Sequence, residues 1–204
     1  MSRRGSGEFS ASSMADIAFL LLIFFLVTTT MDVDSGIARK LPEKVDNPPD
    51  VVIKEKNVLD IVVNRSNQLL VENEFVEVTD IKRLAMDFID NGGGESVAKD
   101  GKPAAPCDYC NGAKDPESSD HPSKAIISLQ SDRGTTYGMY VSIQNEIEGA
   151  YNELRNKLAL KKYRRSYKDL LDDYKDNGTK SLKEKVDFLK DSYPQIISEP
   201  EPIK

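Results

Sequence analysis

The pattern of hydrophobic and polar positions divides the chain into two regions. Residues 14–31 form an apolar run that contains one charged residue, Asp16, and neither glycine nor proline. As a helix this run would extend roughly 27 Å, close to the hydrocarbon thickness of a bilayer. No other run is as long or as apolar. The pattern therefore predicts a single N-terminal transmembrane helix over 14–32, preceded by a short segment at 1–13.

The charges beside this run predict its orientation. Arg3 and Arg4 precede it, and Asp32 and Asp34 follow it. Positive charge stays on the cytoplasmic side, so we expect a single-pass inner-membrane protein with its N-terminus in the cytoplasm. A cleaved signal peptide is the alternative, but no A-x-A-like site follows the apolar run.

A small α+β domain is expected outside the membrane, over 58–159. Short β-branched stretches predict strands at 58–63, 68–71 and 75–78, and a further strand lies at 125–129. Helical spacing follows Thr79, the expected N-cap, as far as Ile89, and again from Met139 onward. The predicted order is β-β-α-β-α.

Two less regular regions flank this domain. Residues 33–57 carry mixed charge and three prolines and read as a linker. Residues 160–204 read as a helical C-terminal extension, with one helix continuing to Tyr174, a second over 180–193 and a closing edge strand at 195–198. Its basic cluster, 161–165, could contact lipid headgroups, the cell wall or an acidic partner, although such clusters are more often solvated faces.

A polar insert at 92–123 holds both cysteines, Cys107 and Cys110, and the only histidine, His121. A local disulfide or plain surface thiols are the simplest interpretation outside the cytoplasm. A zinc site would need a fourth ligand, for which Asp108 and Asp120 are weak candidates. A redox-active pair would normally begin a helix, and this loop has no such setting.

Composition narrows the function further. The chain has 204 residues and a formal net charge of −6, which gives no general argument for nucleic-acid binding. The region 58–159 contains no nucleophile–base pair, phosphate loop or metal signature. We therefore expect a protein that is not an enzyme and that needs no cofactor.

Asp16 is the main candidate for chemistry. A carboxylate within a spanning helix costs on the order of 2.5–3.5 kcal/mol at the bilayer centre, and intramembrane acids usually have a function. One interpretation is that Asp16 merely begins the helix at headgroup level, where unpaired N–H groups favour an acid. The other is that a partner shields it and that it takes up and releases protons. Thr28, Thr29 and Thr30 could then form the outer end of a proton path.

The segment Glu8 to Asp16, followed by the apolar run 20–27, resembles the ExbD/TolR family. That family carries a short E-[IL]-N-x-T-P-like stretch, then two residues and an Asp, and then an LLIIF-like run; Ser12 and Ser13 stand here where Thr and Pro are usual. Leu41-Pro42 matches a family Leu-Pro pair after the span, and the Asp132–x4–Tyr137 spacing also looks like the family.

The resemblance implies a function and partners. Asp16 matches the proton-carrying position of the family. The chain would form a homodimer inside the ring of a polytopic ExbB-like partner, expected to be a pentamer, and Leu41 and Pro42 would contact a partner. The proton-motive force would then energise a TonB-like protein and outer-membrane transport. The alternatives are a TolR-like subunit that maintains the envelope through the cell wall, and a membrane-tethered binding module without proton transfer.

Overall fold

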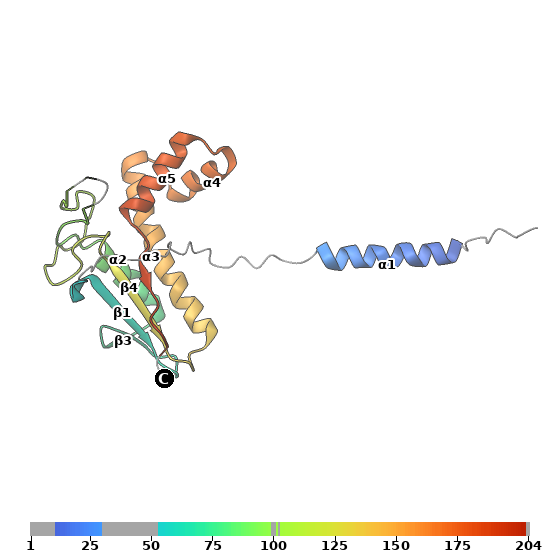
Figure 1. The fold of residues 1–204 in the computed structure, drawn as a ribbon, viewed down its shortest axis with the longest axis horizontal. Helices are drawn as coiled ribbons and strands as arrows, with labels where there is room; N and C mark the ends of the chain where they lie inside the picture. The colour runs from blue at the N-terminus through green and yellow to red at the C-terminus, as the bar shows by residue number, and fades with distance from the viewer. Residues whose placement is uncertain (1–10, 30–52, 99–100, 102, 203–204) are drawn as a thin grey trace, which may run out of the picture. The chain divides into compact units, whose positions relative to one another are not determined.

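The computed structural model describes residues 11–29, 53–98, 101 and 103–202. The chain divides into two compact units, 1–49 and 50–204, and each is considered by itself. The first unit contributes one helix, α1 (Ala11–Thr29), drawn in blue in Figure 1. This helix begins three residues before the predicted one, and the predicted residues after Thr29 lie outside the described part. Among the described helices, none meets the combined length and hydropathy requirement for crossing a membrane.

A five-stranded mixed sheet organises the second unit (Figure 1). Its spatial order is β3-β2-β1-β4-β5, in which β1 pairs antiparallel with β2 and β2 with β3, while β1 pairs parallel with β4 and β4 with β5. The strands are β1 (Val58–Val63), β2 (Leu69–Val71), β3 (Glu74–Val76), β4 (Ile126–Ser131) and β5 (Ile197–Ser198). The small α+β domain expected from the sequence is confirmed by this mixture of sheet and helices.

The hairpin between β2 and β3 closes through a two-residue turn. Glu72 and Asn73 both adopt positive φ, at 49° and 69°. Two consecutive positive φ values match the twist of a tight hairpin, which aligns Leu70 with Phe75. The third strand therefore starts at Glu74, one residue earlier than predicted, and ends at Val76.

Two helices pack against one face of this sheet. They are α2 (Val78–Ile89) and α3 (Tyr137–Tyr163). Strand β1 alternates as a half-buried strand should, since Leu59, Ile61 and Val63 are all at most 5 % exposed. These side chains belong to one continuous apolar core together with the buried positions of both helices.

The helix starts differ from the predicted ones. Glu77 occupies the N-cap of α2 without a side-chain cap bond, so the prediction that Thr79 caps this helix is wrong. Helix α3 starts at Tyr137, two residues before the predicted Met139, because the Thr136 hydroxyl accepts a hydrogen bond from the Met139 amide at 3.4 Å.

The C-terminal extension is a helical pair that returns the chain to the sheet. It comprises α4 (Tyr167–Asn177) and α5 (Lys180–Ser192), capped by Ser166 and Thr179. The prediction of one helix running through to Tyr174 is wrong, because Arg164 adopts a left-handed conformation (φ 55°) that ends α3. After α5 the chain forms β5 at the sheet edge, where the closing strand was expected.

Candidate functional site

Asp16 lies inside α1 and not at its start. The helix begins at Ala11, and its first turn contains no acidic residue. The interpretation that Asp16 simply caps a helix start is therefore weakened by its position one turn further along. Asp16 and the large apolar side chains around it are exposed within this unit.

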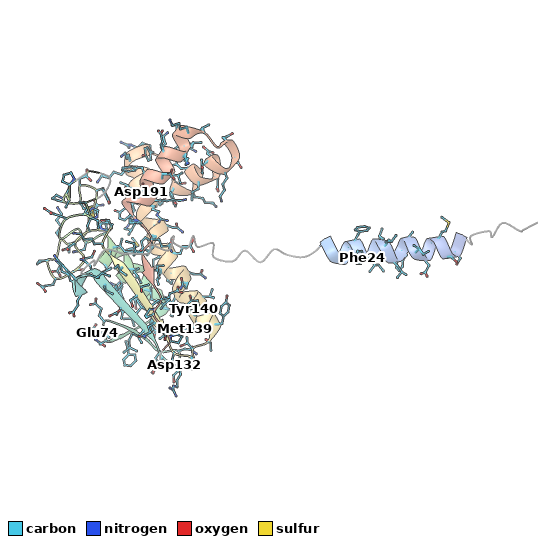
Figure 2. The ribbon with its side chains drawn as sticks, viewed as in Figure 1. Phe24, Glu74, Asp132, Met139, Tyr140 and Asp191 are labelled. Atoms are coloured by element: carbon cyan, nitrogen blue, oxygen red, sulfur yellow. A yellow bond between two sulfur atoms is a disulfide. The ribbon has the colours of Figure 1, made fainter. Side chains whose placement is uncertain are left out.

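The apolar side chains of α1 surround the helix on every side. From Met14 to Leu26, the large hydrophobic residues are between 42 % and 62 % exposed, and Figure 2 shows Phe24 pointing away from the helix. A helix that is apolar all round is stable only where lipid or other protein covers it. Its single carboxylate would then sit among groups that cannot hydrate it.

The other residues predicted to act with Asp16 are less fully described. Thr28 and Thr29 form part of the last turn of α1, and their side chains are not described. Thr30, Leu41 and Pro42 lie outside the described residues. The proton path and the partner contact therefore stay predictions.

The two cysteines of the insert form one disulfide. Cys107 and Cys110 are bonded, with their Cα atoms 5.5 Å apart. The imidazole of His121 contacts a residue of its own loop: its Nδ1 lies 2.9 Å from the Ser123 hydroxyl and accepts a hydrogen bond from the Ser123 backbone amide at 3.1 Å. Across the described ranges, no group of His, Cys, Asp or Glu side chains could hold a metal ion.

Asp120 anchors the insert to the residues that precede β1. Its carboxylate meets the Lys56 ammonium at 2.6 Å and accepts from the Asn57 amide at 3.2 Å, and its side chain is only 7 % exposed. The hydrogen bond from Lys56 is the main reason that the pKa of Asp120 lies below its usual range. Asp120 therefore forms a buried ion pair with Lys56 that holds the insert in place.

A buried cluster joins the insert to the end of α5. The Tyr193 hydroxyl donates to Asp90 Oδ1 at 2.7 Å, and the Asn111 amide donates to Asp90 Oδ2 at 3.1 Å. The Tyr109 hydroxyl donates to the Ser192 carbonyl at 2.7 Å, and its ring meets that of Tyr193 edge to face at 5.4 Å. Burial raises the pKa of Asp90 and of both tyrosines, so the phenols stay protonated donors.

The loop between β4 and α3 carries the Asp132–x4–Tyr137 spacing. Asp132 accepts from the Gly134 amide at 2.8 Å and lies 3.6 Å from Arg65, which ties the loop to the end of β1. Figure 2 shows Asp132 in this loop, with Met139 and Tyr140 on the first turns of α3. Tyr137 is 80 % exposed, so the spacing supports a helix start and contributes little to the core.

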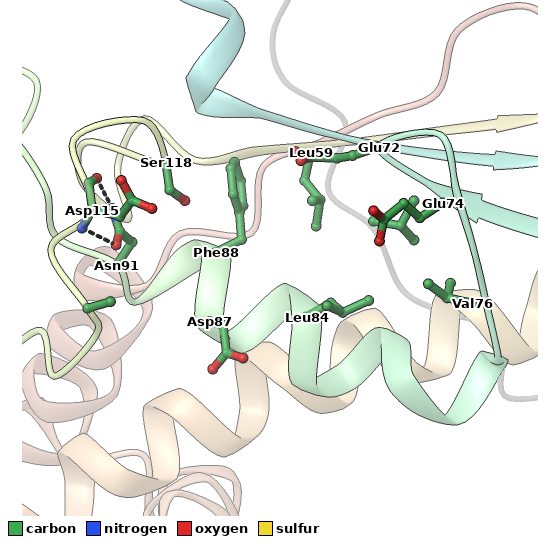
Figure 3. Close-up of a pocket in the computed structure, with 12 residues that line it drawn as sticks. Leu59, Glu72, Glu74, Val76, Leu84, Asp87, Phe88, Asn91, Asp115 and Ser118 are labelled. Carbon is green, nitrogen blue, oxygen red and sulfur yellow. Dashed lines mark hydrogen bonds between the residues drawn. The ribbon is translucent and has the colours of Figure 1, made fainter.

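A groove of about 450 Å³ lies between the β2–β3 hairpin and α2 (Figure 3). Leu59, Leu84 and Phe88 form its apolar side, and Glu72 and Glu74 reach it from the hairpin. At the far end, Asn91 holds the Asp115 backbone through two hydrogen bonds of 2.9 Å. Nothing in the sequence indicated this groove, because it forms only when the hairpin lies over α2.

The described residues thus form an apolar helix that carries one carboxylate and a small mixed α+β domain. The model of the family described as biopolymer transport protein ExbD/TolR matches residues 2–162. The chain therefore belongs to the ExbD/TolR family, which the sequence motif had indicated. No curated protein matches the chain.

The family match indicates what members of this family do and which part of the chain they share. Members serve energy transduction for biopolymer transport as non-enzymatic accessory proteins, and they generally work with ExbB/TolQ-like partners at the inner membrane. The match ends within α3, so the helical pair α4–α5 and strand β5 lie beyond it.

Proposed function

We propose that this chain is the proton-coupled subunit of an inner-membrane complex that uses the proton-motive force to energise TonB-dependent outer-membrane transport. One observation carries the proposal: Asp16 lies in the interior of a helix that is apolar on every side. Membership of the ExbD/TolR family supports it. In this proposal α1 crosses the membrane with the N-terminus in the cytoplasm, and the α+β domain lies in the periplasm.

In this proposal the carboxylate of Asp16 needs other protein chains around it in the membrane. An ionised acid facing lipid is costly, so two copies of α1 would sit inside the ring of a polytopic ExbB-like protein. There the carboxyl group is shielded from lipid and can be loaded from one side and emptied to the other. Moving one charge through the membrane field supplies about 2.3 kcal/mol per 100 mV, sufficient to bias a mechanical step.

The mechanical step must reach the outer membrane through the periplasm. In this proposal the segment around Leu41 and Pro42 contacts the TonB-like partner, and Thr28, Thr29 and Thr30 line the outer end of the proton path. A TolR-like role at the cell wall would use the same carboxylate but a different periplasmic output.

Exchange of Asp16 for Asn tests the proposal, because the amide keeps the size and polarity but cannot carry a proton. The chain and its ring partner would be expressed in a strain lacking its own proteins, and TonB-dependent uptake would be measured. We expect Asp16→Asn to reduce uptake at least tenfold, Asp16→Glu to keep part of it, and Asp60→Asn, an exposed acid on β1, to behave as wild type.

The detergent sensitivity of the same strains distinguishes a role in TonB-dependent transport from a TolR-like role in envelope integrity. Loss of envelope integrity in Asp16→Asn with normal uptake would support the TolR-like role and contradict the TonB assignment. Full uptake and a sound envelope in the Asp16→Asn strain would refute proton work by this residue altogether.

A further inference from the structure

The Cys107–Cys110 disulfide lies against the chain at the end of α2. Gly92 has a φ of 67°, and a Cβ added there would meet the Cys110 Cβ at 2.8 Å and its Sγ at 3.3 Å. The sulfur bridge is therefore seated directly on the Gly92 backbone. Cys107 is 8 % exposed, whereas Cys110 is half-buried, so Cys110 is the more exposed of the two cysteines.

The disulfide loop carries a tyrosine that holds the end of α5. Tyr109 lies between the two cysteines, and its hydroxyl donates to the carbonyl of Ser192, the last residue of α5. The next residue, Tyr193, stacks edge to face on the Tyr109 ring. Tyr109 therefore supplies one of the contacts that hold this junction, beside the bonds of Tyr193 to Asp90 and Arg155.

Strand β5 begins four residues after Tyr193 and is short. It comprises Ile197 and Ser198, and it pairs with β4 over two residues. The Ile127 amide donates to the Ile196 carbonyl at 3.0 Å, which brings the chain to the β4 edge. A strand of this length gains little from pairing, so its docking depends on how firmly its start is held.

We propose that the Cys107–Cys110 disulfide is a redox-responsive latch that, through Tyr109, controls the docking of β5 on the sheet edge. Two unbonded sulfurs need about 3.5 Å or more between them. Because Cys110 packs against Gly92 on one side, we expect the separating thiols to displace the loop, and Tyr109 to move with it. The Arg155 bonds to the Tyr193 carbonyl remain, so reduction would loosen β5 without detaching the extension.

The reductant is a protein dithiol of the thioredoxin-like class. One of its thiolates attacks the sulfur of Cys110, the more exposed cysteine, the bridge breaks, and Cys107 leaves as a thiolate that takes up a proton. The second thiol then attacks the mixed disulfide and releases Cys110 as a thiol. Two electrons and two protons pass to this chain, and the reductant becomes the disulfide.

Amide hydrogen exchange of the full chain in detergent micelles tests the latch, with dithiothreitol as the probe reductant. The reporters are peptides covering 126–131 and 194–199, and the control peptide covers β1. We expect reduction to speed exchange of the Ile127 amide about tenfold, a change of about 1.4 kcal/mol, while β1 is unchanged. The double variant Cys107→Ser/Cys110→Ser should match the reduced chain and should not respond to dithiothreitol.

A second variant keeps the latch falsifiable if the cysteine changes disturb folding. Tyr109→Phe retains the ring and the disulfide but removes the bond to Ser192, so we expect faster Ile127 exchange in the oxidised chain. The control Tyr137→Phe removes a hydroxyl from an exposed tyrosine and should have no effect. Equal Ile127 exchange in the oxidised and reduced chains would overturn the proposal, as would faster exchange throughout 53–202. Neither result bears on Asp16.

Discussion

Replacing Arg155 by alanine removes the side chain on which the C-terminal extension converges. Arg155 belongs to α3 and is only 8 % exposed. Its Nε and Nη2 atoms donate to the Tyr193 carbonyl at 3.2 and 2.8 Å. The guanidinium carbon also lies 5.7 Å from the centre of the Tyr151 ring and 5.8 Å from that of Tyr167. One cation thus joins α3 to α4 and to the junction after α5.

The expected loss follows from these contacts. Hydrogen bonds from a charged donor contribute about 1.5–3 kcal/mol, and each cation–π contact in a partly desolvated place adds roughly 0.5–1 kcal/mol. Relief from burying the charge offsets part of this sum. We therefore expect Arg155→Ala to lower the free energy of unfolding by about 3 kcal/mol. In a domain of this size that is a fall of about 6–12 °C in melting temperature.

Urea unfolding of the full chain in micelles measures the effect, followed by near-ultraviolet circular dichroism. The chain has eight tyrosines and no tryptophan, so the signal reports on tyrosine packing. Arg155→Lys keeps the charge but loses the two-pronged donor and should cost less than Arg155→Ala. The matched control Arg83→Ala removes an arginine that is 63 % exposed and should change stability by no more than about 0.5 kcal/mol. An unfolding midpoint for Arg155→Ala equal to that of wild type would refute the reasoning.

Two further changes test the insert. Gly92→Ala should lower the free energy of unfolding by about 2 kcal/mol, because φ is 67° and the new Cβ would clash with Cys110. The control Gly138→Ala has open space around it and should stabilise α3 slightly. Urea unfolding midpoints measure both effects, and a midpoint for Gly92→Ala equal to that of wild type would contradict the clash. Asp120→Asn should destabilise the chain at pH 7. Lys56 lowers the pKa of Asp120 in the folded state, so the ion pair stabilises the fold above the unfolded pKa of about 3.9, and this stabilisation is lost as the pH falls through the folded pKa. The free energies of unfolding of wild type and Asp120→Asn should therefore converge in acid. Equal stability of the two chains at pH 7 would show that the ion pair does not stabilise the fold.

The sequence by itself determined the features that depend on near neighbours. The apolar run around Asp16, the β-branched stretch 58–63 and the helical spacing after Met139 each appear in local periodicity, and the structure places α1, β1 and α3 there. The family motif is local too, and the family match confirms it. A period of two or of 3.6 residues is a property of a short segment, so it can be read without knowing where that segment packs.

Only the tertiary structure decided what distant segments do to one another. Strand β5 lies beside β4 although about 70 residues separate them in the sequence, and Tyr109 contacts Ser192 across 83. The groove beside α2 and the convergence on Arg155 also join segments far apart in the chain. These contacts arise because apolar side chains become buried and polar groups find hydrogen-bond partners in the folded chain. The local spacing of residues in the sequence does not predict them. For Asp16 the division is the same: its position in an apolar helix can be read from the sequence, while the shielding that we propose would require packing that a short segment does not specify.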